Sequence, residues 1–244
     1  MTEVPAISIE VAGLSKKLRE TQALRDITLK FESGVMHGII GPEGAGKTTL
    51  LRHLVGLLHA NQGEVCYFQN GQKAPFAHIR DHIAYMPQQQ SLYADLSISE
   101  HLNFFRELYA IEHQDYQKRR EELLHITQLT RFVDRPAGKL SGGMYKKLGL
   151  ICALLRSPWA VLLDEPTNGV DPISRQEFWE LLTAFNQRGV LILITTAYMD
   201  EAERCSKAHV LDNGRVIAQG SPKEILQKEG VEGFGALFIK YESA

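Results

Sequence analysis

A stretch of eight residues constrains the fold of this 244-residue chain more than any other feature. Residues 41–48, GPEGAGKT, match the pattern GxxxxGK[ST] at every fixed position. An apolar segment, residues 35–40, precedes them, and apolar residues at helical spacing follow over residues 47–58. Glycines let successive backbone N–H groups point at phosphate oxygens, and the following helix adds the positive end of its dipole. The sequence therefore predicts a nucleotide-phosphate site made by Gly41, Pro42, Glu43, Gly44, Ala45, Gly46, Lys47, Thr48 and Thr49.

Two carboxylates follow a second apolar run much later in the chain. Residues 160–163 read AVLL, and Asp164 and Glu165 come directly after them. Because the carboxyl ends of parallel strands line the ligand crevice, we expect both carboxylates beside the phosphate loop. Phosphoryl-transfer chemistry then predicts that Lys47 reaches the β- and γ-phosphates and that Thr48 and Asp164 hold Mg²⁺. Glu165 would act as the general base that polarises the attacking water.

The rest of the chain alternates between strand and helix patterns. The strands are expected at residues 7–11, 27–31, 35–40, 160–163 and 190–195. The helices are expected at residues 47–58, 101–109, 116–129, 141–155 and 172–187. A hairpin is expected over residues 208–220, around the turn sequence DNG at 212–214. Alternating buried strands and helices favour an α/β fold with a mostly parallel sheet, and we expect residues 90–157 to form an inserted helical subdomain.

Charge, cysteine content and hydropathy exclude several classes of protein. The net charge is −2, so no nucleic-acid partner is indicated. The three cysteines form no CxxC motif and are expected to be free thiols. Cys205 and His209 lie four residues apart, which would place them on one helix face, and we interpret both as structural. The N-terminal segment lacks signal-peptide character, and no apolar run approaches the ~18–20 residues that span a bilayer.

A Ser-Gly-Gly sequence begins the predicted helix at residues 141–155. Ser141, Gly142 and Gly143 would present free backbone N–H groups and a hydroxyl at the positive end of that helix. The segment therefore qualifies as a second anion-binding site. The simpler interpretation is that Ser141 is the helix N-cap and that the glycines are only flexible.

The order of these motifs resembles the nucleotide-binding domain of ABC transporters. Residues 41–48 correspond to Walker A, 85–88 to the Q-loop, 140–144 to the signature motif, 161–164 to Walker B and 166–171 to the D-loop. The amino-acid sequence around these motifs is most similar to that of the drug- and polysaccharide-exporting ABC-2 branch of the family. The resemblance covers residues 1–244 as one domain. It implies a P-loop NTPase core with a mostly parallel sheet, an antiparallel β subdomain and an inserted helical subdomain.

The resemblance also implies partners and roles. Two such domains would form a head-to-tail dimer, and each signature motif would contact the ATP of the partner domain through Ser141, Gly142, Gly143 and Met144. Gln88 would sense Mg²⁺ and the γ-phosphate, alongside Glu165 in catalysis. Residues 91–100 would contact the coupling helices of transmembrane permease subunits, which would hold this chain at the cytoplasmic face of the membrane. The cofactors implied are ATP and Mg²⁺.

Three departures from the family pattern bear on activity. Leu18 stands where an aromatic residue normally stacks on adenine, so the stacking contribution of ~0.5–1.5 kcal/mol is lost. Ala197 stands where the switch region normally carries a histidine that contacts the γ-phosphate. Losing one transition-state donor commonly reduces the rate ~10²–10³-fold. After its glycines the signature reads MYKK, where Gln-Arg often follows.

These departures predict an asymmetric machine. The chain's own site would bind ATP and hydrolyse it slowly, and its intact signature would complete a competent site on a different domain, in a tandem protein or a heterodimer. A soluble ABC ATPase without a transporter is one alternative, although the long coiled coil or charged linker of such relatives is absent from this chain. A nucleotide-gated regulatory module with little hydrolysis is another. Ala197 favours the module, and the retained Glu165 argues against it.

Overall fold

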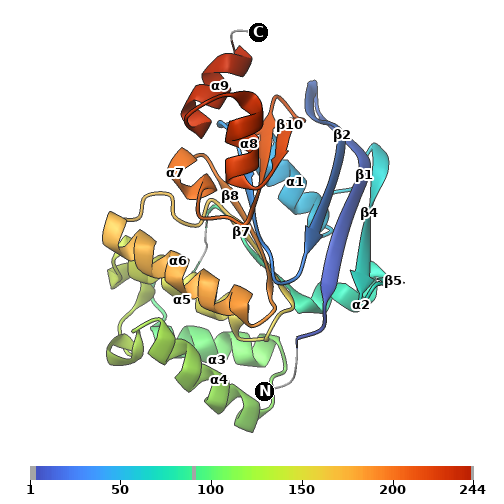
Figure 1. Ribbon diagram of the computed structural model, residues 1–244. Coiled ribbons are helices and arrows are strands. Elements are labelled where there is room, and N and C mark those ends of the chain that lie inside the picture. Colours follow the sequence, from blue (N-terminus) through green and yellow to red (C-terminus); the bar gives the residue numbers. More distant parts are fainter. Residues whose placement is uncertain (1–3, 90–91, 243–244) are drawn as a thin grey trace.

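The computed structural model describes residues 4–89 and 92–242, and it contains two β-sheets with helices packed around them (Figure 1). The larger sheet has six strands in the order β10-β9-β3-β8-β7-β6. Its strands are β3 (Met36–Ile40), β6 (Ile83–Met86), β7 (Ala160–Asp164), β8 (Leu191–Thr196), β9 (Lys207–Asp212) and β10 (Arg215–Gly220). All neighbouring pairs in it are parallel except β9 and β10, which form the predicted hairpin. The predicted α/β fold with a mostly parallel sheet is confirmed.

The smaller sheet is antiparallel and has the order β2-β1-β4-β5. Its strands are β1 (Ile7–Leu18), β2 (Thr21–Glu32), β4 (Gln62–Gln69) and β5 (Gln72–Ala74). The sequence predicted only residues 7–11 and 27–31 here, because the apolar alternation is clear only in those parts. Bulges interrupt the register between Val11 and Lys17, and the alternation is lost beyond them. The antiparallel β subdomain implied by the family resemblance is present.

The helices cover both faces of the six-stranded sheet. They are α1 (Lys47–Leu54), α2 (Phe76–Ile79), α3 (Ile98–Leu108), α4 (His113–Ile126), α5 (Gly142–Leu154), α6 (Pro172–Gln187), α7 (Met199–Ala202), α8 (Pro222–Glu229) and α9 (Phe234–Glu242). Short 3₁₀ turns lie at Arg80–His82, Thr130–Phe132 and Ala137–Lys139. In Figure 1, α3 to α6 gather at one end of the molecule, and α8 and α9 lie at the opposite end. We propose residues 90–157 as a helical subdomain, with residues 90 and 91 outside the described part of the chain.

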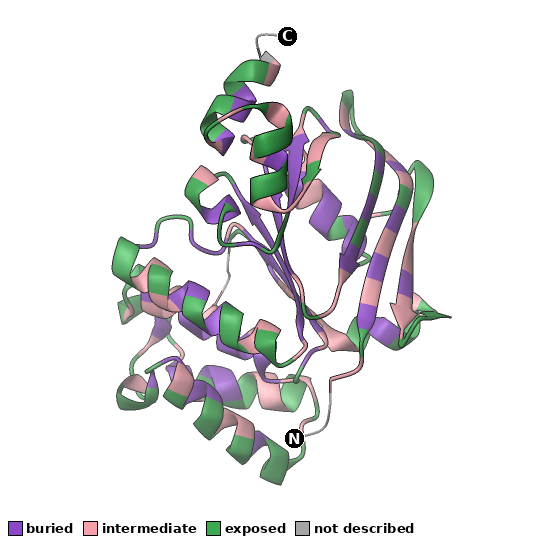
Figure 2. Ribbon diagram, viewed as in Figure 1, coloured by how far each residue is buried: buried purple, intermediate pink, exposed green. Residues whose placement is uncertain are grey.

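The central strands are buried on both faces, as the purple ribbon in Figure 2 shows. Along β7, Val161 and Leu163 pack in the core shared with α3, α4, α5 and α6. Ala160 and Leu162 face the other way, into the core shared with α1 and the antiparallel sheet. Because side chains alternate across a strand, a continuous apolar run supplies both cores at once. The carboxyl end of β7, which carries Asp164, is thereby fixed by packing on both faces of the sheet.

The C-terminal bound of one predicted helix was wrong, and the spacing of Cys205 and His209 does not reflect a common helix. The helix expected over residues 47–58 ends at Leu54, because Gly56 adopts a φ of +70° and lies so close to Phe76 that a Cβ would fall 2.4 Å from its ring. Cys205 and His209 do not share a helix. Cys205 is buried just after α7, and His209 lies in β9 with its ring stacked on that of His37. The three cysteines are free, as expected.

Candidate nucleotide-binding site

The phosphate loop begins where the central strand β3 ends. Gly41 approaches the Leu211 carbonyl so closely that a Cβ would lie 2.1 Å from it, so only glycine fits there. Gly46 has a φ of +105° and lies against the Ala23 carbonyl in the same way. Gly44 also has a positive φ, of +81°, but no atom lies within 4 Å of where its Cβ would be. Gly41 and Gly46 are required by packing, whereas Gly44 leaves open space over the loop.

Lys47 is held inside this loop. Its side chain is only 4% exposed, and its Nζ donates to the Gly41 carbonyl at 2.7 Å and the Pro42 carbonyl at 2.9 Å. The same Nζ lies 3.2 Å from Oε1 of Glu165. A buried ammonium needs such partners, because an unpaired charge in the interior is costly. The structure therefore brings together the predicted phosphate-binding lysine and the predicted general base.

Asp164 ends strand β7 and is fully buried. Its Oδ1 accepts hydrogen bonds from the hydroxyls of Thr195 at 2.7 Å and Thr48 at 3.1 Å. Its Oδ2 accepts from the Tyr85 hydroxyl at 3.4 Å. Burial, and then the charge of Asp164, raise the pKa of Tyr85, so this hydroxyl stays a donor. Three hydroxyls thus compensate the buried carboxylate.

Glu165 occupies an unusual backbone conformation, with a φ of +45°. Such a conformation is uncommon in residues other than glycine, and it turns the side chain back toward the phosphate loop. The Glu165 N–H donates to Thr195, to the carbonyl at 3.2 Å and the hydroxyl at 3.0 Å. Its Oε2 accepts from Nε2 of Gln88 at 2.8 Å. Both carboxylate oxygens therefore have partners, Lys47 on one and Gln88 on the other.

A cavity of about 570 Å³ lies over the phosphate loop. Its walls come from the loop, the start of α1 and the start of β2, together with Gln88 and Glu165. Leu18, predicted to cover adenine, is not among the residues that line it, and its side chain at the end of β1 is 39% exposed. The outer wall is formed by Glu20, Thr21, Gln22, Ala23, Arg25 and Asn213.

Oxygen ligands suited to Mg²⁺ lie in and next to this cavity: Thr48 and Gln88 line it, and Asp164 is buried behind Thr48. The Thr48 hydroxyl and the Asp164 carboxylate are 3.1 Å apart, and Gln88 contributes an amide at the rim. Mg²⁺ prefers oxygen ligands and often takes only one or two carboxylates, with water and phosphate oxygens completing its shell. The three residues thus fit the ion chemically. In the described part of the chain, no cluster of three or more His, Cys, Asp or Glu side chains is arranged to hold a metal by itself.

The switch region begins at the end of β8 with Thr195, whose hydroxyl bonds to Asp164, whereas the hydroxyls on either side of Ala197 bond to Glu201 and Asn168. Ala197 is exposed and offers only a methyl group. The Thr196 hydroxyl donates to Glu201 at 2.6 Å, and the Tyr198 hydroxyl donates to Asn168 at 3.3 Å. The guanidinium of Arg175 lies 4.5 Å from the centre of the Tyr198 ring. The hydroxyls of Thr196 and Tyr198, the potential substitutes for a histidine donor, therefore have other partners.

The signature motif lies apart from this cavity. Ser141 caps α5 by accepting from the Met144 N–H at 3.3 Å, and it is exposed, as is Gly142. Gly143 is different, because a Cβ there would fall 2.4 Å from Oγ of Ser174 on α6. None of residues 141–144 lines the cavity over the phosphate loop. Within one chain, the two predicted anion sites are separate.

Sequence reasoning missed three contributors to the site: Tyr85, Thr195 and Lys146. Tyr85 and Thr195 sit at strand ends beside Asp164, and their sequence neighbours give no sign of that contact. Lys146 donates to the Gln88 carbonyl at 3.3 Å, and burial lowers its pKa. The helical position of Lys146 after the signature is visible in the sequence, but its contact with the Q-loop depends on how α5 packs.

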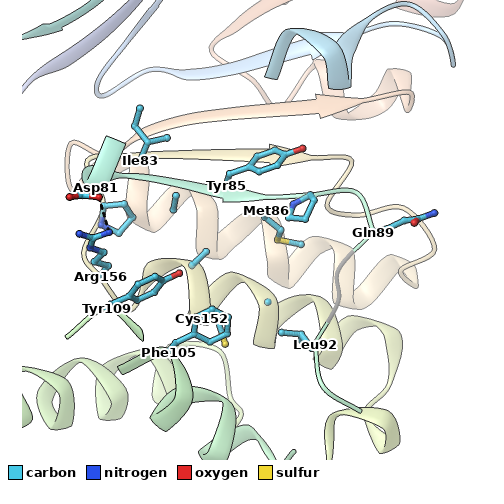
Figure 3. A pocket seen from close by; sticks show the side chains of 15 residues that line it. Asp81, Ile83, Tyr85, Met86, Gln89, Leu92, Phe105, Tyr109, Cys152 and Arg156 are labelled. Atoms are coloured by element: carbon cyan, nitrogen blue, oxygen red, sulfur yellow. Dashed lines mark hydrogen bonds and ion pairs between the residues drawn. The ribbon is translucent and has the colours of Figure 1, made fainter. Parts of the chain in front are cut away.

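A groove lies beside the Q-loop, between the sheet edge and the helical end of the molecule (Figure 3). Met86 of β6 lies on one side of it, and Phe105, Tyr109 and Cys152 lie on the other. An ion pair between Arg156 and Asp81, 3.4 Å apart, closes one end. Its volume is about 350 Å³. Residue 91, the first residue of the segment predicted to contact a permease, lies outside the described residues.

The fold and the site together define a P-loop nucleotide-binding domain. A family model described as ABC transporter matches residues 24–168. The chain is 39% identical to the probable multidrug ABC transporter ATP-binding protein YbhF of Escherichia coli (strain K12), a match covering 90% of this chain and 38% of that protein. It is 34% identical to the Nod factor export ATP-binding protein I of Burkholderia lata, covering 93% of this chain and 75% of that protein.

A solved structure, the ATP-binding subunit of an ABC transporter, superimposes with a TM-score of 0.82 at 30% identity, over 95% of this chain and 98% of that one. The chain belongs to the ABC transporter family, as an ATP-binding domain of the ABC ATPase type. It spans 38% of the length of YbhF. No helix within residues 4–89 and 92–242 combines the length and the apolar character needed to cross a membrane.

Proposed function

We propose that this chain couples ATP binding and hydrolysis to export through transmembrane permease subunits, at the cytoplasmic face of the membrane. Its similarity to a probable multidrug transporter protein and a Nod factor export protein supports the export direction. Residues 41–49 would bind the phosphates. Thr48, Asp164 and Gln88 would hold Mg²⁺, which supplies charge stabilisation at the β- and γ-phosphate oxygens. We retain Leu18 as a proposed adenine contact, although it does not line the cavity over the phosphate loop.

The contact between Lys47 and Glu165 suggests how ATP would prepare the site. In the structure Lys47 lies 3.2 Å from Glu165, and Gln88 holds the other carboxylate oxygen. An arriving γ-phosphate offers Lys47 a stronger anionic partner, because a phosphate carries more charge than a carboxylate. Glu165 would then be released to accept a proton from the attacking water. Substrate binding and activation of the base are thereby linked.

The proposal that this chain's own site hydrolyses ATP slowly rests on the surroundings of Ala197. The methyl group of Ala197 has no donor, and both Thr196 and Tyr198 are engaged elsewhere. Neither hydroxyl beside Ala197 is therefore free to donate to a γ-phosphate. The exposed signature, Ser141, Gly142, Gly143 and Met144, would complete a competent ATP site on a different ABC domain. We therefore propose a heterodimeric or tandem partner.

Steady-state ATP turnover tests this proposal. Wild type should hydrolyse ATP at close to the rate of Glu165→Gln, and Ala197→His should raise the rate by ~10²–10³-fold. Ala197→Gln, which supplies a polar side chain without an imidazole, should stay near wild type. Adding Glu165→Gln to Ala197→His should abolish the gain. Brisk turnover by wild type, absent from Glu165→Gln, would show that another group does the work of the histidine.

We propose the groove beside the Q-loop as the permease contact. Its apolar wall includes Met86, Phe105 and Tyr109, and the charged pair Arg156–Asp81 offers polar anchors. It opens next to residues 92–100, the described part of the segment implied by the family resemblance. Phe105→Asp should reduce retention of the chain on native membranes without changing ATP affinity. Equal retention of Phe105→Asp and wild type would favour a soluble ABC ATPase without a transporter.

A nucleotide-gated regulatory module is the second candidate, and Ala197 is the observation that favours it. Such a module would need nucleotide-dependent association with its partner and no turnover. If Ala197→His gains no activity even when a partner domain is present, the module is the better description.

A further inference from the structure

Glu201 is a fully buried carboxylate outside the nucleotide cavity, with 0% of its surface exposed. Its Oε1 accepts from the Thr167 hydroxyl at 2.7 Å and from Nε1 of Trp179 at 3.2 Å. Its Oε2 accepts from the Thr196 hydroxyl at 2.6 Å. Burying a carboxylate carries a desolvation cost of several kcal/mol, which these hydrogen bonds must offset. The nearest cation is Arg175, whose Nε lies 3.9 Å from Oε1 and has no hydrogen bond of its own.

The donors to Glu201 come from three different parts of the fold. Thr167 belongs to the loop that connects Glu165 to α6, Thr196 is the last residue of β8, and Trp179 lies in the middle of α6. A single carboxylate therefore fixes the loop after the general base against the end of the strand that leads to Ala197. A hydrophobic side chain of similar size would fill the same space without joining these segments.

The end of β8 is in turn connected to the phosphate loop and to both carboxylates of the nucleotide site. The Thr196 carbonyl accepts from the first N–H of the phosphate loop, that of Gly41, at 3.3 Å. The neighbouring Thr195 hydroxyl donates to Asp164 at 2.7 Å and accepts from the Glu165 N–H at 3.0 Å. A shift of this strand end would thus move the phosphate loop and both carboxylates together.

The loop after Glu165 has a second tie to the switch region. The Tyr198 hydroxyl donates to Asn168 at 3.3 Å, and Arg175 packs over the Tyr198 ring. Arg175 also reaches toward Glu201, so the two ties share a residue. The loop over residues 165–171 is therefore held at Thr167 by the Glu201 carboxylate and at Asn168 by the Tyr198 hydroxyl.

We propose that Glu201 is a positioning residue for ATP hydrolysis, which holds residues 165–171 and the end of β8 in the register that places Glu165. Glu201 does not line the cavity, and the groups that donate to it belong to Thr167, Trp179 and Thr196, so its proposed role is indirect. Its effect is on the geometry of the base, and small displacements of a reacting group can reduce a rate ~10²-fold. The inference rests on the proposed hydrolysis at this site.

Glu201→Gln tests the inference, because it keeps the shape and replaces one acceptor oxygen by an NH₂ group that faces hydroxyl or indole donors. Glu203→Gln, at an exposed position two residues further along the chain, is the matched control. In the Ala197→His background, Glu201→Gln should lower kcat by about 10- to 100-fold and leave KM within about twofold. Glu203→Gln should change neither. An unchanged kcat, or a rise in KM alone, would overturn the inference.

Hydrogen exchange separates positioning from a general loss of stability. The Asn168 and Val170 amides donate to the Glu165 and Thr167 carbonyls within the loop. In Glu201→Gln these amides should exchange faster, while the amides of β7 and α1 keep their wild-type protection. Uniformly faster exchange with a lowered Tm would show that Glu201 only stabilises the fold.

Thr167→Val provides a variant that keeps the buried charge if Glu201→Gln does not fold. The two substitutions should be coupled: Thr167→Val should lower kcat as a single substitution, and it should have no further effect when added to Glu201→Gln. Additive effects would contradict a shared role. Exchange is measurable even in a chain that hydrolyses no ATP, whereas turnover against Glu165→Gln decides the proposed function. The two failures are thereby distinguishable.

Discussion

Two helix N-termini in this molecule present backbone N–H groups for an anion, and their surroundings differ sharply. The N-terminus of α1 lies at the floor of a cavity, with Lys47 buried and bound to two loop carbonyls and to Glu165. The N-terminus of α5 is capped by Ser141 alone and lies at the surface. One anion site is surrounded by its own chain, and the other has a single wall.

The glycines show the same contrast at shorter range. At α5, Gly143 is required by packing against Ser174, but Gly142 would accept a Cβ with only the Gly169 carbonyl nearby, at 3.5 Å. The exposed glycine thus faces outward, where a second molecule would have to supply the rest of the site. This exposed helix end leaves room for the contact with a partner domain that we propose for the signature motif.

The largest effect that would sharpen this contrast is expected at Lys47. Lys47→Ala removes the cation that faces the phosphates and leaves Glu165 without its ion-pair partner. We expect a loss of about 3–4 kcal/mol in ATP binding free energy, or roughly 10²–10³-fold in Kd. Ser141→Ala should leave the Kd of the isolated chain unchanged. Equilibrium titration with a fluorescent ATP analogue measures both, and a weakened Kd in Ser141→Ala would break the comparison.

The two signature glycines should separate stability from recognition. Gly143→Ala forces α5 away from α6, because its Cβ would lie 2.4 Å from Oγ of Ser174, and we expect it to lower the free energy of unfolding by about 2 kcal/mol. Gly142→Ala should unfold at the same urea concentration as wild type within error. Urea unfolding followed by circular dichroism decides between them. If both variants were equally destabilised, the open face assigned to Gly142 would be wrong.

The smallest effect concerns pH and the strand that carries the phosphate loop. His37 of β3 and His209 of β9 are buried and stacked, and desolvation lowers their pKa values from 6.5 to about 4 and about 3. Because the unfolded chain binds protons at higher pH than the folded one, stability is present above pH 6.5 and falls as the pH drops toward 4. Between pH 7 and 5 we expect a loss of about 2 kcal/mol for each histidine.

The histidine prediction is checked by urea unfolding across this pH range. His209→Asn should flatten the dependence, whereas His125→Asn, at an exposed position on α4, should not. Hydrogen exchange at pH 5 should be fastest to rise in β3 and β9, with α5 little affected. An equal pH slope in wild type and His209→Asn would show that the pair does not control acid stability.

Much of this protein could be predicted from local sequence. The cap of α5 by Ser141 and the turn at residues 212–214 depend on residues within a few positions of each other. The phosphate loop was recognised from its eight-residue pattern, although Gly41 and Gly46 also pack against the carbonyls of the distant Leu211 and Ala23. The buried strands β3, β7 and β8 were found because continuous apolar runs leave no other environment for them. The family resemblance supplied the fold and the identity of the motifs.

What the sequence could not give depends on packing between distant segments. Strands β4 and β6 are half-buried or short, so their pattern is weak, and they are stabilised by neighbours far away in the chain. The partners of Asp164 come from α1, β6 and β8, and those of Glu201 from β8, α6 and the loop before it. The sequence determined which chemistry is present. The tertiary structure alone decided which buried carboxylate meets which donor, because hydrogen bonds between remote strand ends leave no periodic trace along the chain.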